Sequence, residues 1–155
     1  MHRSMPWFAG AAAIAVADQL AKLAAVHALV LHDPVAVLPF LNLTLVHNTG
    51  AAFSFLAGAG GWQRGFFIVL TLVIGAVIAV WLARSAWRNR ATATALTLIL
   101  GGAVGNLVDR VRLGYVIDFV DLHAAGWHWP AFNVADAAIS CGAVLLAVLA
   151  LTGRE

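Results

Sequence analysis

The sequence predicts an all-α membrane protein with four transmembrane helices and a small β-rich element on the outer membrane surface. Composition is the first reason: 63% of the 155 residues are hydrophobic and only 10% are charged, whereas soluble domains are about 45–50% apolar and about 25% charged. A soluble fold of this size could not bury so much apolar surface. The other two reasons are four long apolar segments and two strand-like segments in the loops between them. We expect a single integral-membrane domain over residues 1–155.

Four segments are long enough to cross a bilayer, which takes about 20 mostly apolar residues in a helix. These spans are expected at residues 7–31, 66–83, 91–108 and 132–152. The first segment also has features of a cleavable secretory signal, because Arg3 precedes an apolar run that reaches the small residues "AVA". Apolar character resumes after Lys22 and continues to Leu31. A full transmembrane span is therefore the favoured interpretation.

Two substantial loops, at about residues 32–63 and 109–131, contain the strand-like segments. In "LNLTLVHN", residues 41–48, apolar and polar side chains alternate, as in a half-buried strand. "YVIDFVDL", residues 115–122, is rich in β-branched and aromatic residues. We expect the two segments to form a small sheet that rests on the membrane, and "GAGGW", residues 58–62, to be a flexible loop.

The positions of the arginines at the span ends predict the orientation, because cytoplasmic loops carry an excess of Lys and Arg. One side of the membrane is expected to hold Arg3, Arg84, Arg88, Arg90 and Arg154, and the other Arg64, Arg110 and Arg112. The purely basic linker "ARSAWRNR" is therefore expected in the cytoplasm, together with both termini. Six tryptophans lie near span ends, as in an interfacial belt: Trp7, Trp62, Trp81, Trp87, Trp127 and Trp129.

Composition and motifs also exclude several functions. A net charge of +2, spread along the chain, does not indicate a nucleic-acid partner. The single cysteine, Cys141, allows no intrachain disulfide and is interpreted as a small buried apolar residue. His123 and His128 lie in one loop, but without an HExxH motif or paired cysteines they do not indicate a zinc site. The serines lack a GxSG-type setting, so we do not expect a serine protease. We also expect no metal and no cofactor.

Polar residues inside the spans are functional candidates, because ionisable groups at membrane depth are costly. Asp18 and Lys22 are four residues apart on the first span, so they can form a structural ion pair with each other. A role in holding the site or a substrate headgroup is an equally open interpretation.

The third span ends in "GGAVGNLVDRVRLG", which combines small and polar residues. Its three glycines allow close helix packing: Gly101, Gly102 and Gly105. Asn106 and Arg110 share one helix face. Asp109 and Arg112 are interpreted as interfacial residues without a special role.

Asp118 and Asp136 are both expected at the outer surface of the bilayer. Asp118 follows the third span by a few residues, and Asp136 begins the fourth, with Asn133 one turn before it. Two facing carboxylates near a low-dielectric boundary cannot both ionise easily, so one of them keeps a proton. Such a pair can activate water against a peptide bond. The alternative is that Asp136 is only an acidic residue favoured at a helix N-terminus.

Five sequence blocks together resemble the bacterial lipoprotein signal peptidase family, signal peptidase II. In chain order these are "DQLAK" (18–22), "HNTGAAFS" (47–54), "GGAVGNLVDR" (101–110), "VIDF" (116–119) and "FNVADAAIS" (132–140). The resemblance covers nearly the whole chain, and the five blocks in this order are specific.

The resemblance implies an aspartyl endopeptidase of the bacterial inner membrane, with its active site at the periplasmic face. Its partners would be membrane lipid and prolipoprotein substrates bearing a diacylglyceryl-cysteine, which it would cut just before that cysteine. Asp118 and Asp136 would be the catalytic pair. The resemblance further implies that the site is lined by Asn48, Gly102, Asn106, Arg110 and Asn133, and that Asp18 and Lys22 are the family's first polar block.

A small transporter or proton-conducting protein is the alternative function. Asp18, Lys22, Asn106 and Asp136 could form a polar relay through a helical bundle. Against this interpretation, most of the polar groups are expected at one membrane face.

Overall fold

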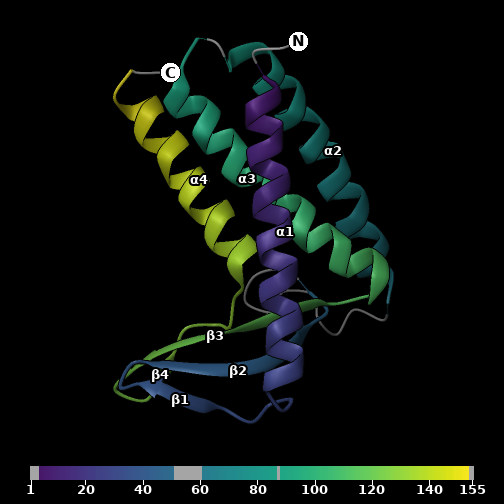
Figure 1. Ribbon diagram of the computed structural model, residues 1–155, viewed down its shortest axis with the longest axis vertical. Helices are drawn as coiled ribbons and strands as arrows, with labels where there is room; N and C mark the ends of the chain where they lie inside the picture. Colours follow the sequence, from purple (N-terminus) through teal and green to yellow (C-terminus); the bar gives the residue numbers. More distant parts are fainter. Residues whose placement is uncertain (1–3, 51–60, 87, 154–155) are drawn as a thin grey trace.

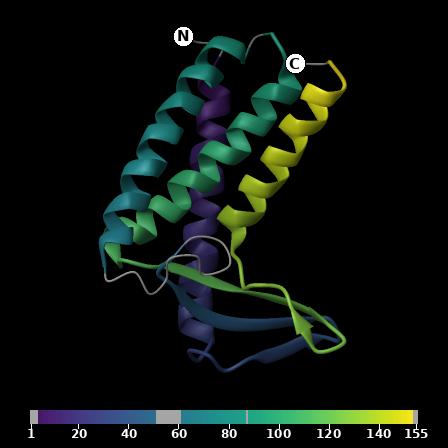
Figure 2. The same ribbon diagram turned by 180° about the vertical axis from the view of Figure 1, so that it is seen from behind.

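A computed structural model of the protein describes residues 4–50, 61–86 and 88–153, and within them contains four long helices and a four-stranded antiparallel sheet (Figures 1 and 2). The helices are α1 (Met5–Ala28), α2 (Trp62–Ser85), α3 (Arg90–Arg112) and α4 (Val134–Leu151). All four are long and apolar enough to cross a membrane. The predicted fold class, four transmembrane helices with a small β-rich element, is confirmed.

The helix boundaries differ from the expected spans by a few residues. α1 ends at Ala28 instead of residue 31, because the chain then joins the sheet, where Leu31 forms a bridge with Leu45. α2 begins four residues earlier than expected, and α3 continues to Arg112. α4 begins at Val134 because the side chain of Asn133 caps its first turn.

α3 lies at the centre of the bundle and contacts each of the other three helices. Glycines allow this close approach. A Cβ atom on Gly101 would lie 2.7 Å from the carbonyl oxygen of Ala11 in α1, and one on Gly102 would lie 2.3 Å from that of Ala135 in α4. α2 instead leaves much of its apolar surface exposed, as expected for a helix that faces lipid; its exposed residues include Val69, Leu72, Val73 and Val77.

The sheet has the strand order β1-β2-β3-β4, and every neighbouring pair is antiparallel. Its strands are β1 (Val35–Leu38), β2 (Leu41–Asn48), β3 (Val116–Ala124) and β4 (Trp127–His128). β2 and β3 correspond to the two segments with strand-like patterns. β1 and β4 were not predicted, because β1 is exposed along its whole length and β4 has only two residues.

The sheet lies at one end of the bundle, opposite the start of α1 and the end of α4 (Figures 1 and 2). The turn between α2 and α3 lies at that far end too, whereas α2 starts and α3 ends beside the sheet (Figure 1). The arginines of the described residues are thus divided between the two ends as the sequence suggested. Arg3, Trp87, Arg154 and residues 58–60 of the expected flexible loop lie outside the described residues.

We predict that the α2–α3 turn is cytoplasmic and that the sheet is on the outer side. In a Cys141→Ser background, which removes the single native cysteine, cysteines would be introduced at Arg88 and at Asp33; both positions are exposed. In intact cells a membrane-impermeant maleimide should label Asp33→Cys but not Arg88→Cys, and lysis should expose the latter. Labelling of both from outside would contradict this orientation.

Candidate active site

Asp118 lies on β3 and is almost fully buried, with an amide donor on each carboxylate oxygen. Asn48 Nδ2, from β2, donates to Asp118 Oδ2 at 3.0 Å. Asn133 Nδ2, from the residue that caps α4, donates to Asp118 Oδ1 at 2.7 Å. The carboxyl group is therefore held from two different elements, which fixes its direction.

A bulge in β2 decides that Asn48 reaches Asp118. Before the bulge Leu43 pairs with Val120, and after it Val46 pairs with Asp118, so β2 contains one extra residue. Because alternate residues of a strand share a face, an unbroken ladder would place His47 opposite Val116, on the face of Asp118. The extra residue shifts the ladder by one position, and Asn48 lies there instead.

Asp136 lies in the first turn of α4 and forms a reciprocal cap with Asn133. The Asp136 backbone N–H donates to Asn133 Oδ1 at 2.9 Å, and the Asn133 backbone N–H donates to Asp136 Oδ2 at 3.3 Å. This capping box is a sufficient structural reason for an acidic residue here. The carboxylate has a further partner, since Asn106 Nδ2 of α3 donates to Asp136 Oδ1 at 2.7 Å.

Asn133 links the two aspartates. It is fully buried, and besides Asp118 its Nδ2 donates to Asn106 Oδ1 and to the backbone oxygen of Ile117, each at 3.2 Å. One asparagine thus contacts Asp118 through its amide and Asp136 through its cap. The aspartates are 18 residues apart in sequence, and the segment just before α4 returns to β3, where Val120 pairs with Phe132.

The pKa of Asp118 is raised to about 7, first by burial and then by the nearby charge of Asp136. The hydrogen bonds from Asn48 and Asn133 and the charge of Lys22 oppose this rise in pKa. Near neutral pH this carboxyl group therefore readily holds and releases a proton, as a general acid or base requires.

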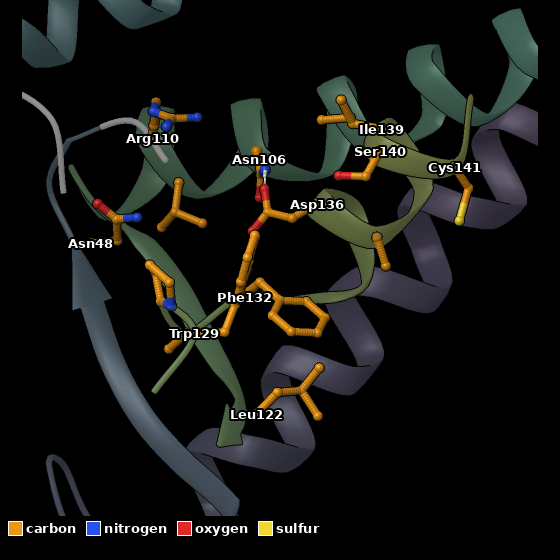
Figure 3. A pocket seen from close by; sticks show the side chains of 14 residues that line it. Asn48, Asn106, Arg110, Leu122, Trp129, Phe132, Asp136, Ile139, Ser140 and Cys141 are labelled. Atoms are coloured by element: carbon orange, nitrogen blue, oxygen red, sulfur yellow. Dashed lines mark hydrogen bonds between the residues drawn. The ribbon is translucent and has the colours of Figure 1, made fainter. Parts of the chain in front are cut away.

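A cavity of about 530 Å³ opens beside Asp136, between α3, α4 and the sheet (Figure 3). Asp136, Asn106, Arg110 and Asn48 form its polar side. The remaining wall is mostly apolar and includes Leu122, Trp129, Pro130, Phe132 and Ile139. A substrate with both a peptide bond and an apolar group would find partners on the two sides.

Arg110 lines this cavity but is also held by the protein. Its Nη2 donates to the backbone oxygen of Gly50 at 3.0 Å, and its guanidinium lies over the ring of Phe67, 5.1 Å from the centroid. Gly102, in contrast, does not line the cavity; it lies in the α3–α4 contact against Ala135. The structure therefore brings Asn48, Asn106, Arg110, Asn133 and both aspartates together, and leaves Gly102 in the helix packing.

A family model described as "Signal peptidase (SPase) II" matches residues 10–152. The chain belongs to the signal peptidase II family. It is 52% identical over 135 residues to the lipoprotein signal peptidase of Hydrogenovibrio crunogenus, covering 87% of this chain and 78% of that protein. It is 54% identical over 142 residues to that of Cupriavidus pinatubonensis, covering 92% and 80%. A solved bacterial membrane enzyme, determined by the in meso method at 2.3 Å resolution, matches with a TM-score of 0.80 and 30% identity over 97% of this chain and 90% of that one.

Membership of the signal peptidase II family identifies the chain as a peptidase. With four helices of spanning length, it is a multi-pass bacterial membrane protein. Over the residues that the structure describes, no group of three or more His, Cys, Asp or Glu side chains is arranged to hold a metal ion.

Asp18 and Lys22 of this signal peptidase II family member do form an ion pair, with Nζ 2.8 Å from Asp18 Oδ2. Lys22 Nζ also lies 2.8 Å from Asp109 Oδ2 and donates to Asn106 Oδ1 at 2.9 Å. The prediction that Asp109 is an interfacial residue without a special role is wrong, since its side chain is buried in this network. Its position three residues after Asn106 on the same helix face was the signal available in the sequence.

Gln19 was also missed by the sequence interpretation. Its Nε2 donates to Asp109 Oδ1 at 2.8 Å and to the backbone oxygen of Gly105 at 3.2 Å. A glutamine next to Asp18 carries no pattern that separates it from an ordinary polar residue. Only the packing of α1 against α3 gives it this role.

Proposed function

We propose that the protein is an aspartyl endopeptidase that removes signal peptides from prolipoproteins and cuts before a cysteine that carries diacylglycerol. The observation that carries the proposal is the pairing of Asp118 and Asp136 through Asn133 beside a cavity with one polar side and a mostly apolar wall. Asp136 lines that cavity, and Asp118 lies on β3, where it accepts a hydrogen bond from Asn48 of the cavity wall. The activity of the relatives, given by their name "lipoprotein signal peptidase", agrees with this chemistry.

In the proposed mechanism the two aspartates share one proton and activate a water molecule. The ionised carboxylate takes a proton from the water, which attacks the scissile carbonyl carbon. The protonated partner donates its proton to the carbonyl oxygen, which gives a tetrahedral intermediate. As the C–N bond breaks, the first carboxyl group passes the proton taken from water to the leaving amine, and the partner regains its proton from the hydroxyl group of the intermediate. A pKa of about 7 for Asp118 supports a singly protonated pair at neutral pH.

The substrate would lie across the cavity, with its peptide backbone on the polar side and its acyl chains along the apolar wall. Asn48 and Arg110 are the proposed contacts for the backbone and the lipid headgroup. Arg110 uses one N–H on Gly50, and a guanidinium has five N–H donors in all. Burial of the acyl chains against Trp129, Phe132 and Ile139 would supply most of the affinity.

We further propose that the chain forms one integral-membrane domain in the inner membrane, with both termini in the cytoplasm. The cavity would then lie at the periplasmic face, next to the sheet. A membrane-embedded signal peptide would present its scissile bond at that depth, because the lipidated cysteine lies just beyond its apolar segment.

A transporter or proton-conducting protein is the second candidate, favoured by the contact chain from Lys22 through Asn106 to Asp136. Against it, this series of contacts does not lead across the membrane. Asp18 and Asp109 connect it to the backbone beside the two aspartates, at the start of α4 and in β3. Within the described residues, these buried charges thus converge on the sheet end of the bundle.

The test of the proposed function is cleavage of a diacylglyceryl-modified precursor by the purified protein in detergent, across a range of pH. Cleavage should fall as pH rises above about 7, because Asp118 then loses its proton. Asn48→Ala removes a hydrogen bond that lowers this pKa, so the alkaline limb should move to higher pH.

Asn42→Ala is the matched control for this pH shift. Asn42 lies on the same strand and donates to a different carboxylate, Asp121 Oδ2, at 3.1 Å. The control should keep the wild-type pH profile. Absence of cleavage at every pH would favour the transporter, and an unmoved limb in Asn48→Ala would contradict the assignment of that limb to Asp118.

A further inference from the structure

We propose that Asp18, Lys22 and Asp109 are positioning residues that set the separation of Asp118 and Asp136. We call these three residues the Lys22 clamp. The inference rests on the proposed function, in which the two aspartates act as a pair. It goes beyond that function by assigning a task to three buried charges that touch neither the proposed water nor the substrate.

The carboxylates of the clamp hold the backbone next to each aspartate in the same way. Asp18 Oδ1 accepts from the backbone N–H of Ala135, the residue before Asp136, at 2.9 Å. Asp109 Oδ2 accepts from the backbone N–H of Ile117, the residue before Asp118, at 3.1 Å. Each aspartate of the pair is therefore preceded by a peptide N–H that is bound to one carboxylate of the clamp.

Lys22 joins the two carboxylates into one unit. Its ammonium has three N–H donors, and three acceptors surround it: Asp18 Oδ2 and Asp109 Oδ2 at 2.8 Å and Asn106 Oδ1 at 2.9 Å. The third contact extends to the pair itself. With its oxygen occupied by Lys22, Asn106 turns its Nδ2 toward Asp136 Oδ1.

The clamp is more than a neutralised ion pair within α1. A pair formed by Asp18 and Lys22 alone would need no partner on another helix. Lys22 nevertheless binds Asp109 of α3, Asp18 binds the start of α4, and Asp109 in turn binds β3. All three side chains are almost fully inaccessible to solvent. Charges in such surroundings are costly unless each is paired and hydrogen-bonded, and here every partner belongs to the backbone or side chains around the site.

Removal of one anchor of the clamp should misplace one aspartate without removing the binding cavity. A displacement of about 1 Å from productive geometry can cost about 100-fold in rate. The expected signature is a fall in kcat with KM little changed, because the cavity wall formed by Trp129, Phe132 and Ile139 is untouched.

The test compares Asp109→Ala with Asp109→Asn, using a peptide with a diacylglyceryl-cysteine as substrate. Asp109→Ala removes the acceptor of the Ile117 N–H and should lower kcat about 100-fold. Asp109→Asn keeps one oxygen for that N–H, and Gln19 can rotate its amide to accept from the new NH₂ group. It should therefore recover most of the lost kcat.

Thr97→Val is the matched control. Thr97 is a buried polar residue of α3 whose Oγ1 donates to the backbone oxygen of Trp7 in α1, at 3.5 Å. It bridges the same two helices away from the aspartates, so its loss should leave kcat and KM near the wild-type values. A full kcat in folded Asp109→Ala, or no recovery in Asp109→Asn, would overturn the proposal.

Gly105→Ala tests the other half of the clamp. Its Cβ would lie 2.6 Å from Asp18 Oδ2 and would push that carboxylate away from its partners. A fall in kcat at unchanged KM is expected again, and an unchanged kcat would contradict the clamp. If Asp109→Ala and Gly105→Ala both fail to fold while Thr97→Val folds, the clamp holds the fold and not the aspartates, and the proposal is wrong.

The proposed function can fail separately. If Asp118→Asn or Asp136→Asn still cleaves the substrate, the proposed catalytic role of the aspartate pair is wrong. If those two variants are inactive while the folded clamp variants keep their kcat, only the positioning role is wrong.

Discussion

Asp118→Asn and Asp136→Asn should each abolish cleavage of a lipidated precursor, with a loss of about 10⁴-fold in kcat. A carboxamide cannot take a proton from water or donate an acidic one, so neither half of the proposed reaction can proceed. The purified variants should remain folded. Asp136→Asn weakens one capping box, at a cost of about 1 kcal/mol, and Asp118→Asn keeps the size of the side chain.

Asp121→Asn is the control for this pair of substitutions. Asp121 is on the same strand as Asp118, but its carboxylate contacts His128 Nδ1 at 2.9 Å and Asn42, away from the cavity. The same chemical change there should leave cleavage near the wild-type rate. Treatment with a chelator should do the same, and a loss of activity that zinc restores would contradict the aspartyl mechanism.

Cleavage should require the lipid on the substrate cysteine, and this is the second large effect we expect. A precursor with diacylglyceryl-cysteine should be processed, while the same precursor without lipid, or with the cysteine replaced by serine, should not. Burial of each CH₂ contributes about 0.8 kcal/mol, so five buried methylenes would change kcat/KM by roughly 1,000-fold. The apolar wall of the cavity has the character that such burial requires.

The three precursors should be compared in one detergent, with product formation followed by gel shift. Phe132→Ser adds a test from the side of the enzyme, because it makes the apolar wall more polar while leaving Asp136 and Asn106 in place. Its kcat/KM for the lipidated precursor should fall. Equal cleavage of all three precursors by the wild-type protein would show that the lipid is not needed for substrate recognition.

The helices could be predicted from the sequence because the physical signal is local. Each apolar stretch of about 20 residues must bury its backbone polar groups within itself in a bilayer, and all four helices were found, with their ends shifted by a few residues. The alternation in residues 41–48 likewise identified β2 with its observed bounds. β1 escaped prediction because its side chains are all exposed, so burial imposed no pattern on it.

The sequence by itself identified most of the polar residues that gather at the sheet end of the bundle. Ionisable and amide side chains in an apolar chain are few, and their cost at membrane depth makes each conspicuous. The motifs around Asp118 and Asp136 pointed to the same residues. Asp18 and Lys22 were recognisable as partners because four residues make one helical turn.

Only the tertiary structure decided how these residues are connected. A one-residue bulge in β2 turns Asn48 toward Asp118, and no local preference in the sequence specifies that extra residue. The burial of Asp109 and the pairing of Lys22 with Asp109 and Asn106 of α3 arise because α1 packs against α3 through small residues. Contacts between segments some 85 residues apart depend on packing, which acts only after the helices and strands have met.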